Sequence, residues 1–499
     1  MKIIPEKWHE EADVIVVGYG GAGAAAAITA HDEGARVLIL EKAPKGEEGG
    51  NTRVSGNVWL TPDPPEKAAS YLRAMCEDYA IPEKMIQVWV DEMGKNNKWV
   101  KSLGGEPVEQ KSLTVEFPDL PGIECVHVYA NGKEAATAGG NEALWLLLKN
   151  SVEERKIRTL FGTPGKRLIQ NPGNNEILGV WANRSGKDMA IKAKKAVVLT
   201  CGGFENNQEM IRNYLTSLSQ GYPKGTPYNT GDGIKMALDV GADLWHMHNI
   251  AGPQYSFKLP DRDVVMYPRR MPGNSYIYVS GAGERFVFEQ AYAILTAEGL
   301  KYPVKHGKIW RYGQWVPSPT PPSMYCIFDE KTRRKGPIYG GDPYKIGWVE
   351  ILDLYDWSID NSKEIEKGWI KRASTIGELA RNLNLPSDKL KETVDRYNHY
   401  CKQGKDPDFD RDPQTLEPLN EPPYYGIPLM PTFINTQGGP RRDEKAQILN
   451  PFDEPIPRLY SSGELGSIYG FLYQGGGNVG ECMAFGRIAG RNAAAQKPW

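Results

Sequence analysis

The chain has few cysteines, and none of them is spaced to hold a metal or a haem. Six cysteines are spread over 499 residues, without a CxxC or CxxCH pattern. This excludes the usual zinc-knuckle spacing and a covalently attached c-type haem, and it argues against a disulfide framework. The six cysteines are Cys76, Cys125, Cys201, Cys326, Cys401 and Cys482. We expect no metal site, and a reducing, cytoplasmic setting.

Long apolar runs and an excess of one charge are also lacking. No apolar stretch reaches the ~20 residues of a membrane-spanning helix, and the segment from Met1 to Glu11 lacks the apolar run of a secretion signal. The formal net charge is −2 with 24% charged residues, so nothing attracts nucleic acid or an anionic membrane. We therefore expect a small-molecule substrate, without nucleic acid or a membrane span.

A strand, a glycine turn and a helix open the chain. Residues 13–17 predict a buried parallel strand, G-x-G-x-x-G follows at 18–23, and an alanine-rich helix begins there. A second apolar run at 37–40 ends in Glu41. In such a unit the first glycine makes the tight turn, the second lets the backbone approach a pyrophosphate, and the third lets the helix pack closely on the strand. The N-terminus of the helix attracts the anionic pyrophosphate. The acid accepts bonds from the adenosine ribose. The unit predicts a dinucleotide, either NAD or FAD.

The rest of the chain predicts an α/β fold with an insertion. Further strands are expected at 158–160, 176–181 and 195–200, and an amphipathic helix at 139–152. The middle of the chain is richer in proline, tyrosine and tryptophan, and its last segment returns to a glycine-rich α/β pattern. We expect a Rossmann-like dinucleotide-binding domain, formed by residues 1–253 and 426–499, interrupted by a substrate or cap domain at 254–425.

The loop after Glu41 favours FAD over NAD. Its pattern G-G-N-T-x-x-S-G at 49–56 resembles the flavoprotein-subunit family of fumarate reductase and succinate dehydrogenase. Other blocks similar to that family are CGGF at 201–204, TGDG at 230–233, RFVFE at 285–289, NTQGG at 435–439, SGE at 462–464 and FGRIAG at 485–490. The resemblance covers nearly the whole chain, and it implies FAD.

The resemblance also implies which residues hold FAD. Glu464 maps onto the family's contact with the ribityl chain. The expected cofactor-binding residues are Gly18, Gly20, Gly21, Ala22, Gly23, Glu41, Lys42, Gly49, Gly50, Asn51, Thr52, Ser55, Gly56, Gly202, Gly203, Asp232, Gly463, Glu464, Asn478 and Val479. Succinate dehydrogenases tether FAD through a histidine in the loop, but residues 43–57 contain none, so non-covalent FAD is expected. No second G-x-G-x-x-G with a βαβ frame is present, so a built-in NAD(P)H site is not expected and the electrons should come from or go to an external partner.

The substrate end departs from the family's dicarboxylate enzymes. Those enzymes place a histidine and an arginine in an HGxNR-x-GGN stretch, and a proton-donating arginine soon after RFxNE. Here the stretches YGFLYQGGGN at 469–478 and QAYAIL at 290–295 contain no histidine and no arginine. Burying two unpaired carboxylates costs several kcal/mol, so a dicarboxylate substrate is disfavoured.

Both places carry tyrosine instead, as in the 3-ketosteroid dehydrogenase branch of the family. That resemblance implies that the Tyr473 hydroxyl and the N–H of Gly476 or Gly477 hold a substrate carbonyl. Preplaced donors of this kind stabilise the oxygen of a growing enolate. Tyr292 would be the base in desaturation, or the acid in the reverse direction.

Three functions stay open at this stage. The first is an FAD-dependent desaturase or ene-reductase acting on the Cα–Cβ bond of a ketone, cyclic or steroid-like. The second is reduction of an enoate such as fumarate or an aryl acrylate, with Arg53, Arg269 or Arg270 supplying the carboxylate site. The third is an electron-transfer flavoprotein subunit whose chemistry lies in a partner protein.

Overall fold

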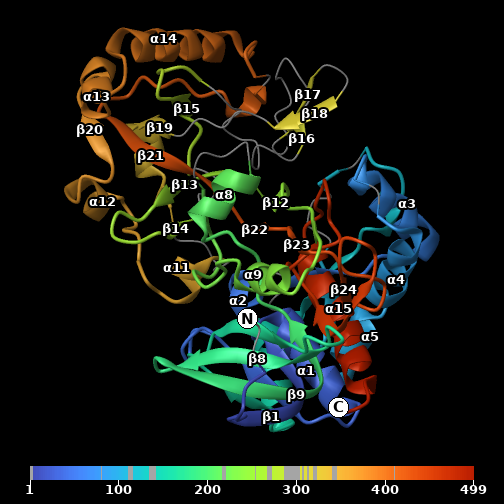
Figure 1. Cartoon of the computed structure of the whole chain (residues 1–499). Helices are drawn as coiled ribbons and strands as arrows, with labels where there is room; N and C mark the ends of the chain where they lie inside the picture. Colours follow the sequence, from blue (N-terminus) through green and yellow to red (C-terminus); the bar gives the residue numbers. More distant parts are fainter. Residues whose placement is uncertain are drawn as a thin grey trace.

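The structure is a computed structural model, and Figure 1 shows its two lobes, one around a mainly parallel sheet and one around an antiparallel sheet. It describes residues 4–79, 81–110, 116–117, 119–133, 142–215, 221–252, 254–266, 272–285, 304–305, 308–311, 314–317, 323–339, 346–409 and 411–499. Among them, no helix is both long enough and apolar enough to cross a membrane.

The sheet of the first lobe has the strand order β24-β25-β9-β1-β2-β6, and β8 pairs with β9 and β7 beside this path. Strands β25, β9, β1, β2 and β6 run parallel, whereas β7, β8 and β24 are antiparallel to their neighbours. The bounds are β1 (Glu10–Val17), β2 (Val37–Leu40), β6 (Arg158–Leu160), β7 (Gly165–Gln170), β8 (Ile177–Arg184), β9 (Lys187–Leu199), β24 (Gln447–Leu449) and β25 (Pro455–Ser461).

Both faces of this sheet are buried. Val14 and Val16 of β1 pack with the helices on one face, whereas Ile15 and Val17 pack with β7, β8 and a short helix on the other. A central parallel strand covered on both faces needs the continuous apolar run that the sequence shows. The helices are α1 (Gly21–Asp32), α7 (Ala143–Glu154) and α15 (Gly477–Ala495) on the first face and α9 (Asp232–Asp239) on the second.

Helices α1 and α15 pack unusually closely. A Cβ atom on Gly490 would lie 2.4 Å from the carbonyl oxygen of Ala26, and one on Gly486 would lie 2.7 Å from the Cβ of Ala25. The FGRIAG block therefore has a packing role: its glycines let the last helix lie against the helix that follows the glycine turn. This contact joins the two ends of the chain in one lobe.

A small helical group extends the first lobe. It contains α2 (Gly50–Val54), α3 (Pro65–Cys76), α4 (Glu83–Met93) and α5 (Asn96–Ser102), with β3 (Val58–Leu60), β4 (Pro107–Glu109) and β5 (Val128–Asn131) as a three-stranded sheet. The buried apolar side chains of α3, α4 and α5 belong to the same core cluster as those of α1 and α15, whereas Val54 of α2 packs with the core of the second lobe.

The second lobe is built around β21. Its sheet has the order β14-β13-β21-β19-β15, and β10 and β20 also pair with β21. The strands are β10 (Tyr222–Pro223), β13 (Gln254–Lys258), β14 (Val265–Met266), β15 (Tyr276–Ser280), β19 (Met324–Asp329), β20 (Lys371–Ala373) and β21 (Tyr424–Phe433). The helices of this part are α10 (Glu330–Arg334), α11 (Trp348–Ile351), α12 (Ser362–Glu366), α13 (Ile376–Asn382) and α14 (Ser387–Gln403).

Short elements connect the lobes. The strand pairs β11 with β23 and β12 with β22 join the chain leaving the first lobe to the chain returning to it. These strands are β11 (Leu244–Trp245), β12 (Ile250–Ala251), β22 (Asn435–Thr436) and β23 (Gly439–Pro440). The remaining elements are α8 (Gln208–Tyr214) and a separate three-stranded sheet of β16 (Val304–Lys305), β17 (Lys308–Arg311) and β18 (Gln314–Pro317). The expected α/β fold with a Rossmann-like part is confirmed. The division into domains at 253/254 and 425/426 stays a proposal, and β21 runs across its second limit.

Candidate active site

The glycine turn between β1 and α1 has the geometry that a dinucleotide site requires. Gly18 has a φ of +108°, in the region that favours glycine. A Cβ on Gly23 would lie 2.0 Å from the carbonyl oxygen of Gly18, so the third glycine allows the helix to approach the strand. At Gly20 the nearest atom to such a Cβ is 3.4 Å away, and this glycine faces the cavity. These three environments are compatible with the three roles expected from the sequence, which stay predictions.

Glu41 lies in the wall of the same cavity, and the backbone holds it in place. One of its carboxylate oxygens accepts from the Tyr19 N–H and the other from the Ala43 N–H, both at 2.6 Å. Burial raises the pKa of Glu41, and the two N–H groups act in the opposite direction. Each oxygen keeps a further lone pair, so the carboxyl group can still accept a bond from a ribose hydroxyl.

The structure brings thirteen of the twenty expected cofactor residues to one cavity. They are Gly18, Gly20, Gly21, Ala22, Glu41, Lys42, Gly50, Asn51, Thr52, Gly202, Asp232, Gly463 and Glu464. Seven others are not in its lining: Gly23, Gly49, Ser55, Gly56, Gly203, Asn478 and Val479. Several of these support the lining instead. The Ser55 hydroxyl, for instance, donates to the carbonyl of Thr52 at 2.8 Å. The roles of all twenty toward FAD stay predictions.

Two polar groups near the cavity lack partners in the described part of the chain, as a cofactor site would require. The buried hydroxyl of Ser462, in the cavity wall, has no hydrogen-bond partner there. The N–H of Val479, in the first turn of α15, has none among the described residues either. The first N–H groups of a helix need acceptors, and a bound dinucleotide offers several. The residues present therefore fit FAD.

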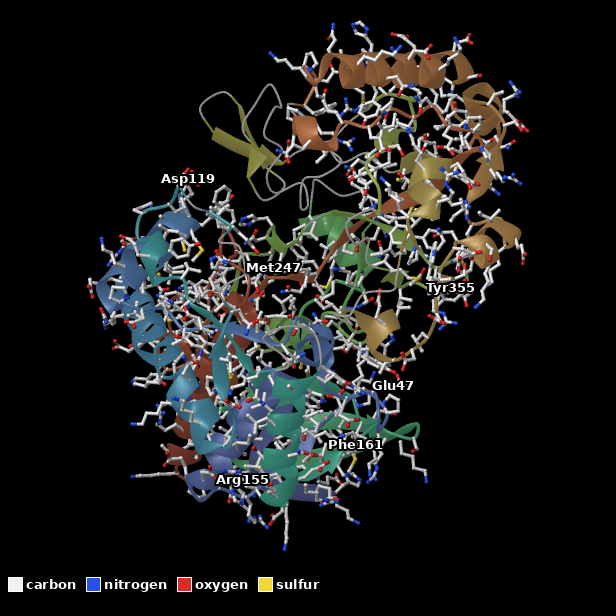
Figure 2. The ribbon with its side chains drawn as sticks, turned by 180° about the vertical axis from the view of Figure 1, so that it is seen from behind. Glu47, Asp119, Arg155, Phe161, Met247 and Tyr355 are labelled. Atoms are coloured by element: carbon white, nitrogen blue, oxygen red, sulfur yellow. The ribbon has the colours of Figure 1, made fainter. Side chains whose placement is uncertain are left out.

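Lys42 is held by residues on the far side of the cavity. Its ammonium group donates to Asp232 Oδ2 at 2.7 Å, to Thr230 Oγ1 at 2.5 Å and to the carbonyl of Tyr228 at 3.1 Å. Glu47, which also lines the cavity, accepts a bond from the Tyr228 hydroxyl, and Figure 2 places it at the level where the lobes meet. The pair of Lys42 and Asp232 thus closes the cavity by joining two distant segments.

Two buried carboxylates, Glu464 in the cavity lining and Glu205 behind it, share the amide donor of Asn51. The amide nitrogen of Asn51 donates to Glu205 at 2.8 Å and to Glu464 at 3.0 Å. The amide nitrogen of Asn229 donates to the same Glu205 oxygen at 2.7 Å. Burial raises the pKa of Glu464, and the charge of Glu205 raises it further. Sequence analysis missed Glu205 and Asn229, although Glu205 directly follows the CGGF block.

The start of α15 presents donors next to a phenol. The N–H of Asn478 donates to the Tyr473 hydroxyl oxygen at 3.3 Å. The N–H of Gly477 donates to the carbonyl of Gln474 at 2.9 Å, whereas that of Gly476 has no partner among the described residues. Of the two glycines expected to hold a substrate carbonyl, Gly476 is therefore the one with a free donor. Burial raises the pKa of Tyr473, which keeps the phenol protonated.

The side chain of Asn478 forms hydrogen bonds within the protein and does not line the cavity. Asn478 and Gln437 exchange two amide bonds, at 2.8 and 2.9 Å. This pair fixes the NTQGG stretch to the first turn of α15. Close by, a Cβ on Gly438 would lie 2.6 Å from Met247, which Figure 2 shows between the two lobes. Gln437 is a further residue that sequence analysis missed.

Of the three arginines considered for a carboxylate site, Arg53 is already engaged. Arg53 pairs with Glu142 at 2.6 Å and donates to the carbonyl of Gly46 at 2.6 Å. Arg269, Arg270 and Tyr292 lie outside the described residues. Arg285, from the RFVFE block, forms a buried ion pair with Asp406 at 2.8 Å in the second lobe.

This fold and cavity define a class, a dinucleotide-binding protein with a mainly parallel sheet beside the cavity and a second, antiparallel lobe. The chain belongs to the FAD binding domain family, whose model matches residues 13–479. FAD is its cofactor, and it is a dehydrogenase or reductase acting on CH–CH bonds. These expectations and the resemblance from which they came are confirmed, while non-covalent attachment of FAD stays a prediction.

Two relatives come from the two branches considered. The chain is 27% identical to 3-oxosteroid 1-dehydrogenase of Mycolicibacterium smegmatis, over 97% of this chain and 98% of the relative. It is 28% identical to a fumarate reductase (cytochrome) of Shewanella frigidimarina, over 97% of this chain and 77% of the relative.

Solved structures show the same fold. A 3-ketosteroid delta1-dehydrogenase from Sterolibacterium denitrificans, in complex with 1,4-androstadiene-3,17-dione, matches with a TM-score of 0.76 and 24% identity, over 97% of this chain and 100% of that chain. The open conformation of a flavocytochrome c3 fumarate reductase matches with a TM-score of 0.70 and 22% identity, over 98% and 78%.

Proposed function

We propose that this flavoprotein desaturates a cyclic, steroid-like ketone at the bond between its α and β carbons, or catalyses the reverse reduction of the enone. The observation that carries this proposal is the group of neutral donors at the start of α15. The Tyr473 hydroxyl accepts from the N–H of Asn478, and its own proton is left to donate outward. A neutral carbonyl oxygen suits such donors, whereas a dicarboxylate needs cations.

In the proposed reaction, Tyr473 and the N–H of Gly476 bind the substrate carbonyl. Both donors lie at the positive end of a 19-residue helix. Fixed donors and a helix dipole stabilise negative charge as it develops on the carbonyl oxygen, and this makes the α proton more acidic. Tyr473 acts as a donor here and not as a base, because its raised pKa keeps the phenol protonated.

Proton transfer at the α carbon is assigned to Tyr292, on the resemblance to the ketosteroid branch alone. In desaturation its phenolate would take the α proton, and in reduction its phenol would return it. FAD, when bound, supplies the hydride acceptor for the β carbon, or the donor in the reverse direction. The cavity residues of the glycine turn and Glu41 would hold its pyrophosphate and ribose. The electrons then pass to or from an external partner.

Reduction of an enoate is the competing function, and the fumarate reductase relative favours it. It requires a cationic site for the carboxylate. Arg53 is committed to Glu142 and to main-chain carbonyls, so it is poorly placed to supply one. The third candidate, an electron-transfer subunit, requires a partner protein to carry out the chemistry.

The test is to mix the oxidised, FAD-loaded protein anaerobically with 3-ketosteroids and simple cyclic ketones. The proposal expects the oxidised-flavin absorption band to bleach, with the matching enone as product. The dithionite-reduced protein should likewise be reoxidised by enones. Bleaching by succinate but by no ketone, or reoxidation by enoates but by no enone, would refute the proposal. Sustained turnover by the single chain with an artificial electron acceptor would exclude a mere electron-transfer role.

A further inference from the structure

Glu116 lies against the glycine run that precedes α15. Its backbone N–H donates to the side-chain oxygen of Gln474 at 3.3 Å, and the Tyr71 hydroxyl of α3 donates to that same oxygen at 2.9 Å. The Glu116 carboxylate accepts from the N–H of Gly475. A Cβ on Gly475 would lie only 2.9 Å from Glu116 Oε1, so the glycine gives the carboxylate close access to the main chain.

The surroundings of Glu116 are acidic and phenolic. Tyr71 faces it from α3, and Tyr473 faces it from the segment before α15, where burial and then the charge of Glu116 raise the pKa of Tyr473. Asp119 lies on its own segment, and Glu464 acts on Tyr473 from the inner end of the cavity. In the described part of the chain, no cation contributes to the environment of Glu116.

We propose that Glu116 is a specificity-determining residue, which makes the substrate end select neutral carbonyl compounds against carboxylates. The inference rests on the proposed function, since it places the substrate carbonyl at Tyr473 and Gly476. A carboxylate ligand in that position would approach a second negative charge that no described cation offsets. Like charges so placed are an effective means of excluding the wrong ligand.

This arrangement links the binding of a carboxylate to protonation. Burial raises the pKa of Glu116 to about 7, and the N–H of Gly475 partly offsets that rise. Above that pH a carboxylate ligand must either meet an ionised Glu116 or bind together with a proton. One linked proton weakens binding by about fivefold between pH 7 and pH 8, and by about tenfold for each further pH unit. A neutral ketone carries no such requirement.

The experiment measures ligand binding by the FAD-loaded protein from the perturbation of the flavin absorption spectrum, without turnover. The two probes are cyclohex-2-enone and its charged counterpart cyclohex-1-ene-carboxylate, at pH 6, 7 and 8. For the wild-type protein, the Kd of the carboxylate should rise about fivefold from pH 7 to pH 8, while that of the enone stays constant. Glu116→Gln should tighten carboxylate binding at pH 8 by about tenfold, flatten its pH dependence and leave the enone Kd within twofold.

The matched control is Asp119→Asn, which removes an exposed acid three residues further along the chain. It should leave both Kd values within twofold. The inference is overturned if Glu116→Gln changes neither the carboxylate Kd nor its pH dependence, or if both probes respond equally. FAD content and melting temperature show whether each variant is folded, and Glu116→Asp, which keeps the charge, should retain the selection. If carboxylates reoxidise the reduced protein and no enone does, the proposed function fails. If enones react but Glu116→Gln does not change the preference for neutral ligands over carboxylates, only this inference fails.

Discussion

The N–H of Asn478 lies 3.3 Å from the hydroxyl oxygen of Tyr473. A helix leaves its first N–H groups without partners inside the helix, and here a phenol satisfies one of them. Because the phenol oxygen is the acceptor in this bond, its own proton stays available for donation to another group. One interaction thus completes the start of α15 and prepares a hydrogen-bond donor.

Tyr473→Phe removes that donor and leaves the ring. We expect turnover of ketones to fall about 10²–10³-fold, the loss typical when one oxyanion donor is removed. FAD content should not change. The measurement is the rate of flavin bleaching by ketone in single turnover. Tyr469→Phe is the matched control, because its fully buried hydroxyl lies beside the indole of Trp89 and its ring packs 5.4 Å from that of Tyr473. Equal losses in both variants would contradict the role of Tyr473.

Tyr292→Phe tests the assignment that rests on the sequence alone. A general acid or base contributes about 10²–10⁴-fold to the rate, so most turnover should be lost. Ketone binding, followed by flavin spectral perturbation, should change little, in contrast to Tyr473→Phe. If activity stays within a few-fold of wild type, the proton is transferred by another group.

The local features of the fold could be predicted from the sequence. Strands β2 and β6 have the expected bounds, and for β2 a short, fully buried apolar run determines them. Strand β9 begins eight residues earlier than expected, at Lys187, because its polar first half forms a hairpin with β8. Alternation of polar and apolar residues there gives less signal than a continuous apolar run.

The cavity wall was predictable only where a motif marks it. Glu205 meets Asn51 across 154 residues of chain, and Gln437 meets Asn478 across 41. Such amide contacts have no local spacing that a single sequence could reveal. Gly477 uses its N–H in a turn, where it donates to the carbonyl of Gln474, whereas Gly476 does not. A run of identical glycines does not indicate which N–H is used in this way.

Gly23→Ala tests the close approach of α1 to the glycine turn. The new methyl group would lie 2.0 Å from the carbonyl oxygen of Gly18, so the backbone must shift. We expect a loss of about 1–3 kcal/mol in the free energy of unfolding and much weaker FAD binding. Urea unfolding and FAD titration measure the two effects. Gly173→Ala is the control, since its nearest contact would be a side-chain atom 3.4 Å away; similar losses in both variants would refute the argument.

Glu205→Gln tests the buried carboxylate pair through the pH dependence of stability. Burial raises the pKa of Glu205 and of Glu464, so the folded protein holds protons that the unfolded chain releases above the ordinary glutamate pKa near 4.5. The stability that depends on these protons is therefore complete at low pH and is lost as the pH rises toward the raised pKa values, by up to about 1.4 kcal/mol per pH unit for each group.

The amide oxygen of the introduced glutamine can still accept from Asn51 and Asn229, while the negative charge beside Glu464 is gone. We expect the variant without FAD to lose less stability than wild type between pH 5 and pH 8 in urea unfolding, and Glu464→Gln to behave alike. Glu33→Gln, at an exposed position, should follow the wild-type curve. Parallel curves for wild type and Glu205→Gln would mean that the two carboxylates ionise independently of folding.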